Sequence, residues 1–125
     1  SYQSEFMNQY QLHGTYAPCA SYRLLKKAAD TAEEMKLNYK VGSVVSGDVF
    51  YSELPELVWA KMGVLAGEME CAALYAVAAR AGKEALCMCT ISDIIGGDAA
   101  NNLTPEERQS SFDEMIRLAL EVADE

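Results

Sequence analysis

The sequence has few basic residues: ten lysines and arginines stand against nineteen acidic residues, which gives a formal net charge of −9. Nucleic acids and anionic membranes both attract basic surfaces, so we predict that the chain binds neither. It also has no apolar run near the ~20 residues that a membrane-spanning helix needs, and no signal-peptide pattern at its start. Because the first residue is serine, we expect that the chain was processed or excerpted from a longer protein.

The sequence also lacks the cysteine and histidine spacing of a metal site. It contains no C-x-x-C pair, and His13 is its only histidine, so we predict no zinc site. Most of the cysteines lie in apolar stretches, and we expect them to be small buried thiols in a reducing cytoplasm. The four are Cys19, Cys71, Cys87 and Cys89.

The hydrophobic pattern alternates between strand-like and helix-like segments. This predicts an α/β fold, with a mainly parallel mixed sheet and flanking helices, in a single domain over residues 1–125. We expect an irregular segment over 1–20, strands at 39–48, 64–70 and 84–92, and helices at 21–35, 53–63, 70–82 and 104–123. The helix over 70–82 is apolar nearly all round, so we expect it to be largely buried.

The last predicted helix is the best marked. Thr104, Pro105 and Glu107 form a T-P-x-E capping box with proline at the first helical position. The apolar residues that follow at helical spacing predict its buried stripe. They are Phe112, Met115, Ile116, Ala119, Leu120 and Ala123.

Polar and aromatic residues gather where the three predicted strands end. In parallel sheets all strands point the same way, and ligands bind beyond their carboxyl ends. The segments at those ends are 46–51 (SGDVFY), 67–70 (GEME) and 92–93 (SD). We therefore expect acids and aromatic rings that are distant in the sequence to meet at one edge of the sheet.

Two charged residues are candidates for catalysis. A carboxylate at the end of an apolar strand, such as Asp93, loses hydration, and this favours the protonated form that a general acid needs. The alternative is that Asp93 makes an Asx turn or a cap. Arg108 is a cation at the start of a helix, where the helix dipole opposes it. It therefore either pairs with Asp93 across the loop 94–103 or is a surface arginine without a role.

The other two strand ends offer binding groups. Glu68 and Glu70 flank Met69 where a strand passes into a helix. They either complement the helix dipole, or one of them accepts paired hydrogen bonds from a vicinal diol such as ribose. Phe50 and Tyr51 could stack on a flat heterocycle, although at least one of two adjacent aromatic residues is expected in the core.

Four segments, in this order and spacing, closely resemble the carboxyl-terminal half of bacterial hexameric purine nucleoside phosphorylases. The likeness extends over nearly the whole chain and includes HGTYAP in the opening segment. EME alone is shared with uridine phosphorylases and adenosylhomocysteine-type nucleosidases of the same superfamily, whereas FYS together with EERQSSF is more specific to the purine enzymes. The segments are SGDVFYS, GEMECAALYAVAARAG, CTISD and TPEERQSSFDEMIRLAL.

The resemblance implies phosphorolysis, in which a purine nucleoside and phosphate give a free base and ribose 1-phosphate without a cofactor. It implies that Asp93 protonates N7 of the leaving purine as an oxocarbenium-like sugar develops, and that Arg108 swings towards this acid when the last helix rearranges. The chain departs from many family members, which have a histidine or serine after the aspartate, by having Ile94 there. The loop that follows also looks longer in this chain. These departures concern base preference and loop closure.

The resemblance also implies the substrate-binding residues. Met69 and Glu70 would hold the ribose, Glu70 through the sugar hydroxyls, and Glu68 beside them is a further substrate-binding candidate. Phe50 would stack near the base, and Ser92 would line the same pocket.

The phosphate site of the family has no counterpart in this sequence. Family members use a glycine-containing loop and arginines of the amino-terminal half, with an arginine and a histidine of a neighbouring subunit. Here there is no such loop, and Arg23 lies on a predicted solvated helix face, whereas phosphate needs fixed cations or converging N–H donors. We therefore predict the base- and ribose-binding half of a homo-oligomeric enzyme, with little turnover alone. The alternatives are a nucleosidase or uridine phosphorylase of the superfamily, or a truncated, inactive domain for assembly or ligand binding.

Overall fold

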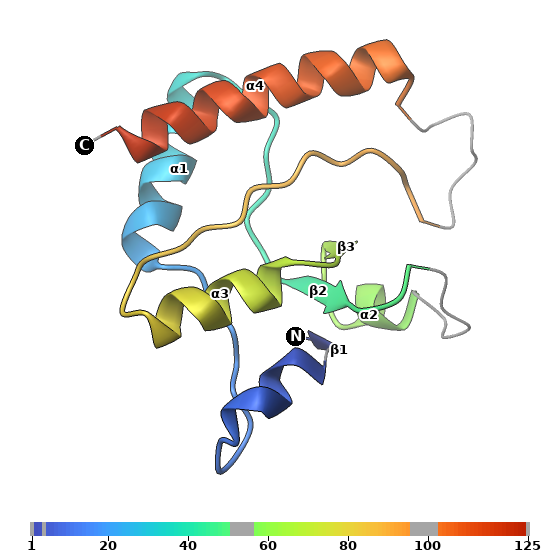
Figure 1. Cartoon of the computed structure of the whole chain (residues 1–125). Coiled ribbons are helices and arrows are strands. Elements are labelled where there is room, and N and C mark those ends of the chain that lie inside the picture. The colour runs from blue at the N-terminus through green and yellow to red at the C-terminus, as the bar shows by residue number, and fades with distance from the viewer. Residues whose placement is uncertain (1, 4, 51–56, 96–102, 125) are drawn as a thin grey trace. The chain divides into compact units, whose positions relative to one another are not determined.

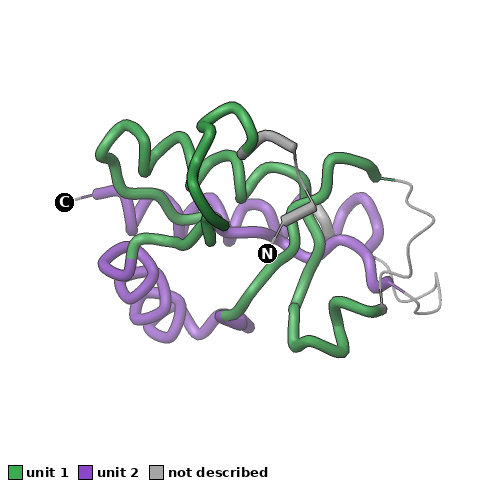
Figure 2. Tube along the Cα trace, turned by 90° about the horizontal axis from the view of Figure 1, so that it is seen from below, with its two compact units in different colours: residues 1–21, 42–87 green, residues 22–41, 88–125 purple. Residues whose placement is uncertain are grey.

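The computed structural model describes residues 2–3, 5–50, 57–95 and 103–124 (Figure 1). The chain divides into two compact units (Figure 2). Unit 1 comprises residues 1–21 and 42–87, and unit 2 comprises residues 22–41 and 88–125. The single domain over 1–125 stays a prediction. None of the helices in the described ranges combines the length and the apolar character that crossing a membrane requires.

A small parallel sheet organises unit 1. Its strands lie in the order β1, β2, β3, and Ser46 of β2 pairs with Tyr2 on one side and with Glu68 on the other. The predicted α/β class with a parallel sheet is therefore confirmed. The strands are β1 (Tyr2–Gln3), β2 (Val44–Gly47) and β3 (Ala66–Glu68).

The opening segment is more regular than predicted. Residues 1–20 were expected to be irregular, but Tyr2–Gln3 pair with β2, and η1 (Glu5–Tyr10) is a 3-10 helix. A two-residue strand is too short to show a periodic pattern. It exists only because it pairs with a strand more than forty positions away. Local pattern therefore could not reveal it.

Two α-helices belong to unit 1, namely α2 (Leu57–Lys61) and α3 (Cys71–Arg80). The prediction that α3 is largely buried is correct for one face only. Its buried residues are Cys71, Ala72 and Ala76, whereas the side chains of Leu74 and Val77 are 45% and 52% exposed. Small side chains line the buried face, so the backbone of α3 packs closely there.

The predicted strand over 84–92 is wrong: residues 83–94 belong to neither a helix nor a strand. Individual hydrogen bonds hold the beginning of this segment. The Ser21 N–H donates to the Ala85 carbonyl (2.9 Å), the Ala85 N–H donates to the Ser21 hydroxyl (3.0 Å), and the Cys87 N–H donates to the Tyr75 hydroxyl (2.9 Å). The apolar run has strand-like composition, but a strand also needs a ladder of backbone partners.

Unit 2 is built on α1 (Tyr22–Glu34) and α4 (Pro105–Ala123). On α1 the buried residues are Ala28 and Ala32. The Lys27 ammonium of α1 donates to the carbonyl of Val122 (3.0 Å) and to that of Asp124 at the end of α4. A cation at a helix C-terminus satisfies the last carbonyls and complements the dipole, so Lys27 stabilises the end of α4.

The predicted capping box at the start of α4 is confirmed. The Glu107 N–H donates to the Thr104 hydroxyl (3.2 Å), and the Thr104 N–H donates to the Glu107 carboxylate (2.8 Å). These reciprocal bonds satisfy two backbone donors that the helix itself leaves without partners. Pro105 follows at the first helical position.

The buried stripe of α4 matches the predicted one only in part, since Met115 and Ala119 are half-buried. Leu118 and Val122 are buried, whereas Phe112, Ile116 and Leu120 are 39%, 49% and 65% exposed. The helix has apolar residues on more than one side, so spacing alone could not decide which of them is covered.

Truncating a leucine on each side of α4 tests this assignment. Leu118→Ala removes a buried side chain and should lower the free energy of unfolding by roughly 2–5 kcal/mol. Leu120→Ala removes an exposed one and should change it by less than about 0.5 kcal/mol. Urea unfolding of both variants measures the difference, and equal losses would contradict the observed orientation.

The capping box also predicts a pH dependence of stability. The backbone hydrogen bond from Thr104 holds the pKa of Glu107 below its ordinary value of 4.5. A lowered pKa in the folded state adds stability above the ordinary pKa, and this is lost as the pH falls through the folded-state value. The wild type should therefore exceed Glu107→Gln in thermal stability near neutral pH, and the two should converge in acid, once the pH falls below the lowered pKa of Glu107. Glu106→Gln is the control, and a Glu107→Gln difference that persists unchanged in acid would refute the assignment.

Candidate functional site

The carboxyl ends of β2 and β3 form one edge of the sheet in unit 1 (Figure 1). The strands are parallel and paired, so the segments that follow them leave the sheet on the same side. One segment leads to Phe50, whose side chain is 70% exposed, and the other to Glu70, which is also exposed. The structure thus brings two of the three predicted strand ends together. Tyr51 lies outside the described residues.

Glu68, the last residue of β3, is enclosed by protein donors. One carboxylate oxygen accepts a hydrogen bond from the Ser46 hydroxyl. The other accepts from the backbone N–H groups of Glu70 (2.5 Å) and Cys71 (2.6 Å). Of the two sequence interpretations of Glu68, the structure shows the one in which the acid complements the start of a helix.

Ser46 is a residue that the sequence interpretation missed. It is 3% exposed, and it is the only buried polar residue among those that the structure describes. Its hydroxyl donates to Glu68 and accepts from the Ala72 N–H (2.9 Å). The signal that could have revealed it is a lone hydroxyl in an apolar strand, because a buried hydroxyl needs hydrogen-bond partners.

Glu70 and Met69 stand at the junction between β3 and α3. Glu70 occupies the N-cap position of α3, but its side chain makes no capping hydrogen bond. Its carboxylate is exposed, and the neighbouring Met69 side chain is 39% exposed. The junction therefore presents a carboxylate and a thioether to solvent, which is the arrangement that a sugar-binding role would need.

Ser92 and Asp93 form a hydrogen-bonded pair in unit 2. The Ser92 hydroxyl donates to the Asp93 carboxylate (2.6 Å), and the Leu103 N–H donates to the Ser92 carbonyl (3.2 Å). Ser92 is half-buried, but Asp93 is exposed. The expectation that Asp93 is sheltered at the end of a buried strand is therefore wrong for this chain, because residues 83–94 form no strand.

Arg108 lies in α4, directly after the capping-box residue Glu107. Its side chain is outside the described part of the structure, and so are residues 96–102. The predicted pairing of Arg108 with Asp93 therefore stays a prediction.

The cysteines differ from the prediction of buried, separate thiols. Cys71 and Cys87 are joined as a disulfide within unit 1, with their Cα atoms 6.0 Å apart. Cys19 and Cys89 lie outside this disulfide and are exposed. Sequence spacing could not identify the pair, because sixteen residues separate its members and the pairing depends on how α3 packs.

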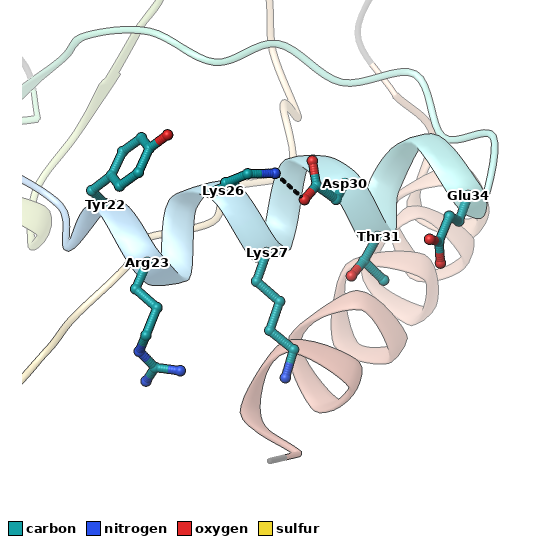
Figure 3. A pocket seen from close by; sticks show the side chains of 7 residues that line it. All are labelled: Tyr22, Arg23, Lys26, Lys27, Asp30, Thr31 and Glu34. Carbon is teal, nitrogen blue, oxygen red and sulfur yellow. Dashed lines mark hydrogen bonds and ion pairs between the residues drawn. The ribbon is translucent and has the colours of Figure 1, made fainter.

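A hollow of about 500 Å³ lies along α1 (Figure 3). None of the predicted site residues whose side chains the structure describes lines it. Three of its charged groups are engaged locally. Lys26 forms an ion pair with Asp30 (2.5 Å) that raises the pKa of the lysine, and Lys27 donates to the end of α4. The lining residues are Tyr22, Arg23, Lys26, Lys27, Asp30, Thr31 and Glu34.

Comparison with known proteins connects these features to a family. A family model described as "Phosphorylase superfamily" matches residues 2–125. The chain is 47% identical to a protein of Caldanaerobacter subterraneus subsp. tengcongensis, over 94% of this chain and 51% of that protein. It is 46% identical to a Clostridium perfringens protein, over 98% of this chain and 53% of that protein. A Geobacillus kaustophilus protein is 48% identical, over 86% of this chain and 45% of its own length.

All three relatives carry the name "Purine nucleoside phosphorylase DeoD-type". The chain spans about half the length of the curated relatives that it matches. The family match, in contrast, extends over nearly every residue of the chain. By that match, the chain belongs to the phosphorylase superfamily.

Proposed function

We propose that the chain is the base- and ribose-binding half of a purine nucleoside phosphorylase. The observation that carries this proposal is the 47% identity, over 94% of the chain, to a relative that bears this name. The resemblance to hexameric enzymes extends the proposal to a cytoplasmic homo-oligomer that uses phosphate as co-substrate and needs no cofactor. The fold also supports the proposal, because the exposed residues Phe50 and Glu70 follow β2 and β3, whose carboxyl ends lie at one edge of the sheet.

In the proposed reaction, a phosphate oxygen bonds to C1′ of the ribose while the bond from C1′ to N9 of the purine breaks. The electron pair of that bond passes into the purine ring, and Asp93, acting as general acid, donates a proton to N7. The proton that phosphate releases on forming the ester replaces the one that Asp93 gave. The Ser92 hydroxyl, 2.6 Å from the Asp93 carboxylate, orients the acid, and Arg108 supports it.

The exposed groups of unit 1 suit the binding of the nucleoside. The Glu70 carboxylate makes no capping bond, so its oxygens can accept hydrogen bonds from the two ribose hydroxyls. Met69 contributes an adaptable apolar contact to the sugar. The exposed ring of Phe50 can stack on a purine.

A chimera tests the reaction and its general acid. In it, this chain replaces the matching half of the C. subterraneus relative, and we expect phosphate-dependent release of hypoxanthine from inosine. Asp93→Asn should lower kcat roughly 10²–10⁴-fold, because an amide cannot donate the acid proton. Asp113→Asn, an exposed change on α4, should leave the rate unchanged. The 125-residue chain alone should show little turnover.

Three results would contradict this assignment. Equal cleavage with and without phosphate would indicate a nucleosidase, and a preference for uridine would indicate a uridine phosphorylase. A folded chimera that cleaves neither nucleoside would indicate an inactive assembly or ligand-binding domain.

Glu70→Gln tests the sugar contact. The variant keeps the size of the side chain but loses the charge that strengthens both bonds to the diol, and charged hydrogen bonds are worth about 1.5–3 kcal/mol. We expect kcat/KM for inosine to fall roughly 10–100-fold, with a smaller loss for 2′-deoxyinosine, which lacks one hydroxyl. Glu114→Gln on α4 serves as the matched control. Equal losses for both nucleosides would exclude the proposed diol contact.

A further inference from the structure

Two side chains from neighbouring strands hold the start of α3. Ser46 and Glu68 are register partners across β2 and β3, and their side chains are hydrogen bonded. Together they accept from three consecutive backbone N–H groups, those of Glu70, Cys71 and Ala72. These are donors that a helix cannot satisfy internally, so the sheet supplies the cap that α3 lacks.

Because of this arrangement, the side chain of Glu70 is not needed to cap α3, although Glu70 occupies the N-cap position. The N-cap residue of a helix commonly accepts a hydrogen bond from the first turn with its own side chain. Here Glu70 makes no such bond, because the Glu68 and Ser46 oxygens already take the N–H groups. Glu70 contributes its backbone instead: its N–H donates to Glu68, and its carbonyl accepts from Leu74 (2.9 Å). Its backbone is thus fixed on both sides while its carboxylate remains exposed.

The two capping residues, Ser46 and Glu68, are less exposed than Glu70, so they are less accessible to a ligand. Ser46 is 3% exposed, and Glu68 is half-buried with both carboxylate oxygens engaged by protein donors. A carboxylate in this state has little capacity left for a sugar hydroxyl. Glu68 therefore acts on the backbone of Glu70 and not on a ligand.

We propose that Ser46 and Glu68 are positioning residues, which hold the first turn of α3 so that Glu70 meets the ribose hydroxyls in one fixed geometry. The inference rests on the proposed function for the identity of the ligand. Fixed placement matters because a displacement of about 1 Å of a binding group can cost roughly 100-fold in rate. The role differs from that of Glu70, which would contact the substrate directly.

Amide hydrogen exchange on the 125-residue chain tests the structural part. Ser46→Ala and Glu68→Gln each remove acceptors from the first turn of α3. The amides of residues 70–72 should then exchange at least roughly 10-fold faster, because they open locally. Ser43→Ala is the matched control, since Ser43 is an exposed serine directly before β2. Unchanged exchange at residues 70–72 in both capping variants would overturn the proposal.

Kinetics of the chimera test the positioning role. Both variants should lower kcat/KM for inosine roughly 10-fold or more and should affect 2′-deoxyinosine much less, as Glu70→Gln does. A merely structural defect would reduce both nucleosides equally, and that result would overturn the proposal. Combining Ser46→Ala with Glu70→Gln should add little to the loss from Glu70→Gln alone, because both act through one contact. Additive losses would count against the proposal.

The outcomes separate this inference from the proposed function. If the parent chimera does not cleave inosine, the proposed function fails and the positioning role fails with it. If Glu70→Gln leaves the preference for inosine over 2′-deoxyinosine unchanged, the proposed diol contact fails, and with it the positioning role, but the proposed reaction does not. If Glu70→Gln removes the preference but neither capping variant does, the positioning role alone is wrong. Should Ser46→Ala unfold the chain, Glu68→Gln, which keeps the side-chain volume, decides both measurements.

Discussion

The main physical requirement in unit 1 is that the backbone N–H groups at the start of α3 find hydrogen-bond acceptors. A helix that begins directly after a strand leaves backbone N–H groups pointing towards the sheet, and each one buried without an acceptor costs about 1–3 kcal/mol. In this chain the acceptors come from the last residue of β3 and from its partner in β2, Glu68 and Ser46. The parallel pairing of β2 and β3 therefore also places the acceptors that the start of α3 needs. Because the cap also fixes the backbone of Glu70, the geometry of the candidate site depends on the same contacts.

Features whose signals lie within a few residues could be predicted from the sequence. The capping box of Thr104 and Glu107 is one, since both partners are three positions apart. The end of α3 is another: Gly82 follows the helix with a positive φ of 64°, a conformation that favours glycine. The parallel order of β2 and β3 followed from the helix-rich pattern between and around the strands.

Features that depend on distant partners could not be predicted. Tyr2–Gln3 became a strand only through pairing with Ser46 and Gly47, and the apolar run over 84–92 did not become one because it lacks a ladder. The covered side of α4 was predicted only in part, since Leu118 and Leu120 are equally apolar and only packing distinguishes them. For the candidate site, the edge that presents Phe50 and Glu70 was foreseeable. The exposure of Asp93 and the capping role of Ser46 were not.

Glu68 and Glu70 show how position assigns different roles to the same chemical group. Both are carboxylates at the positive end of α3, two residues apart. Glu68 belongs to β3, so the pleat directs it to Ser46 and the first N–H groups. Glu70 belongs to the junction and remains exposed. Under the proposed function, this cap would orient the carboxylate that binds the sugar without involving the base. That proposal agrees with the resemblance, in which EME is shared by superfamily members that act on different bases. It leaves base preference to residues elsewhere, for which Phe50 and the Ser92–Ile94 segment are the candidates from the sequence.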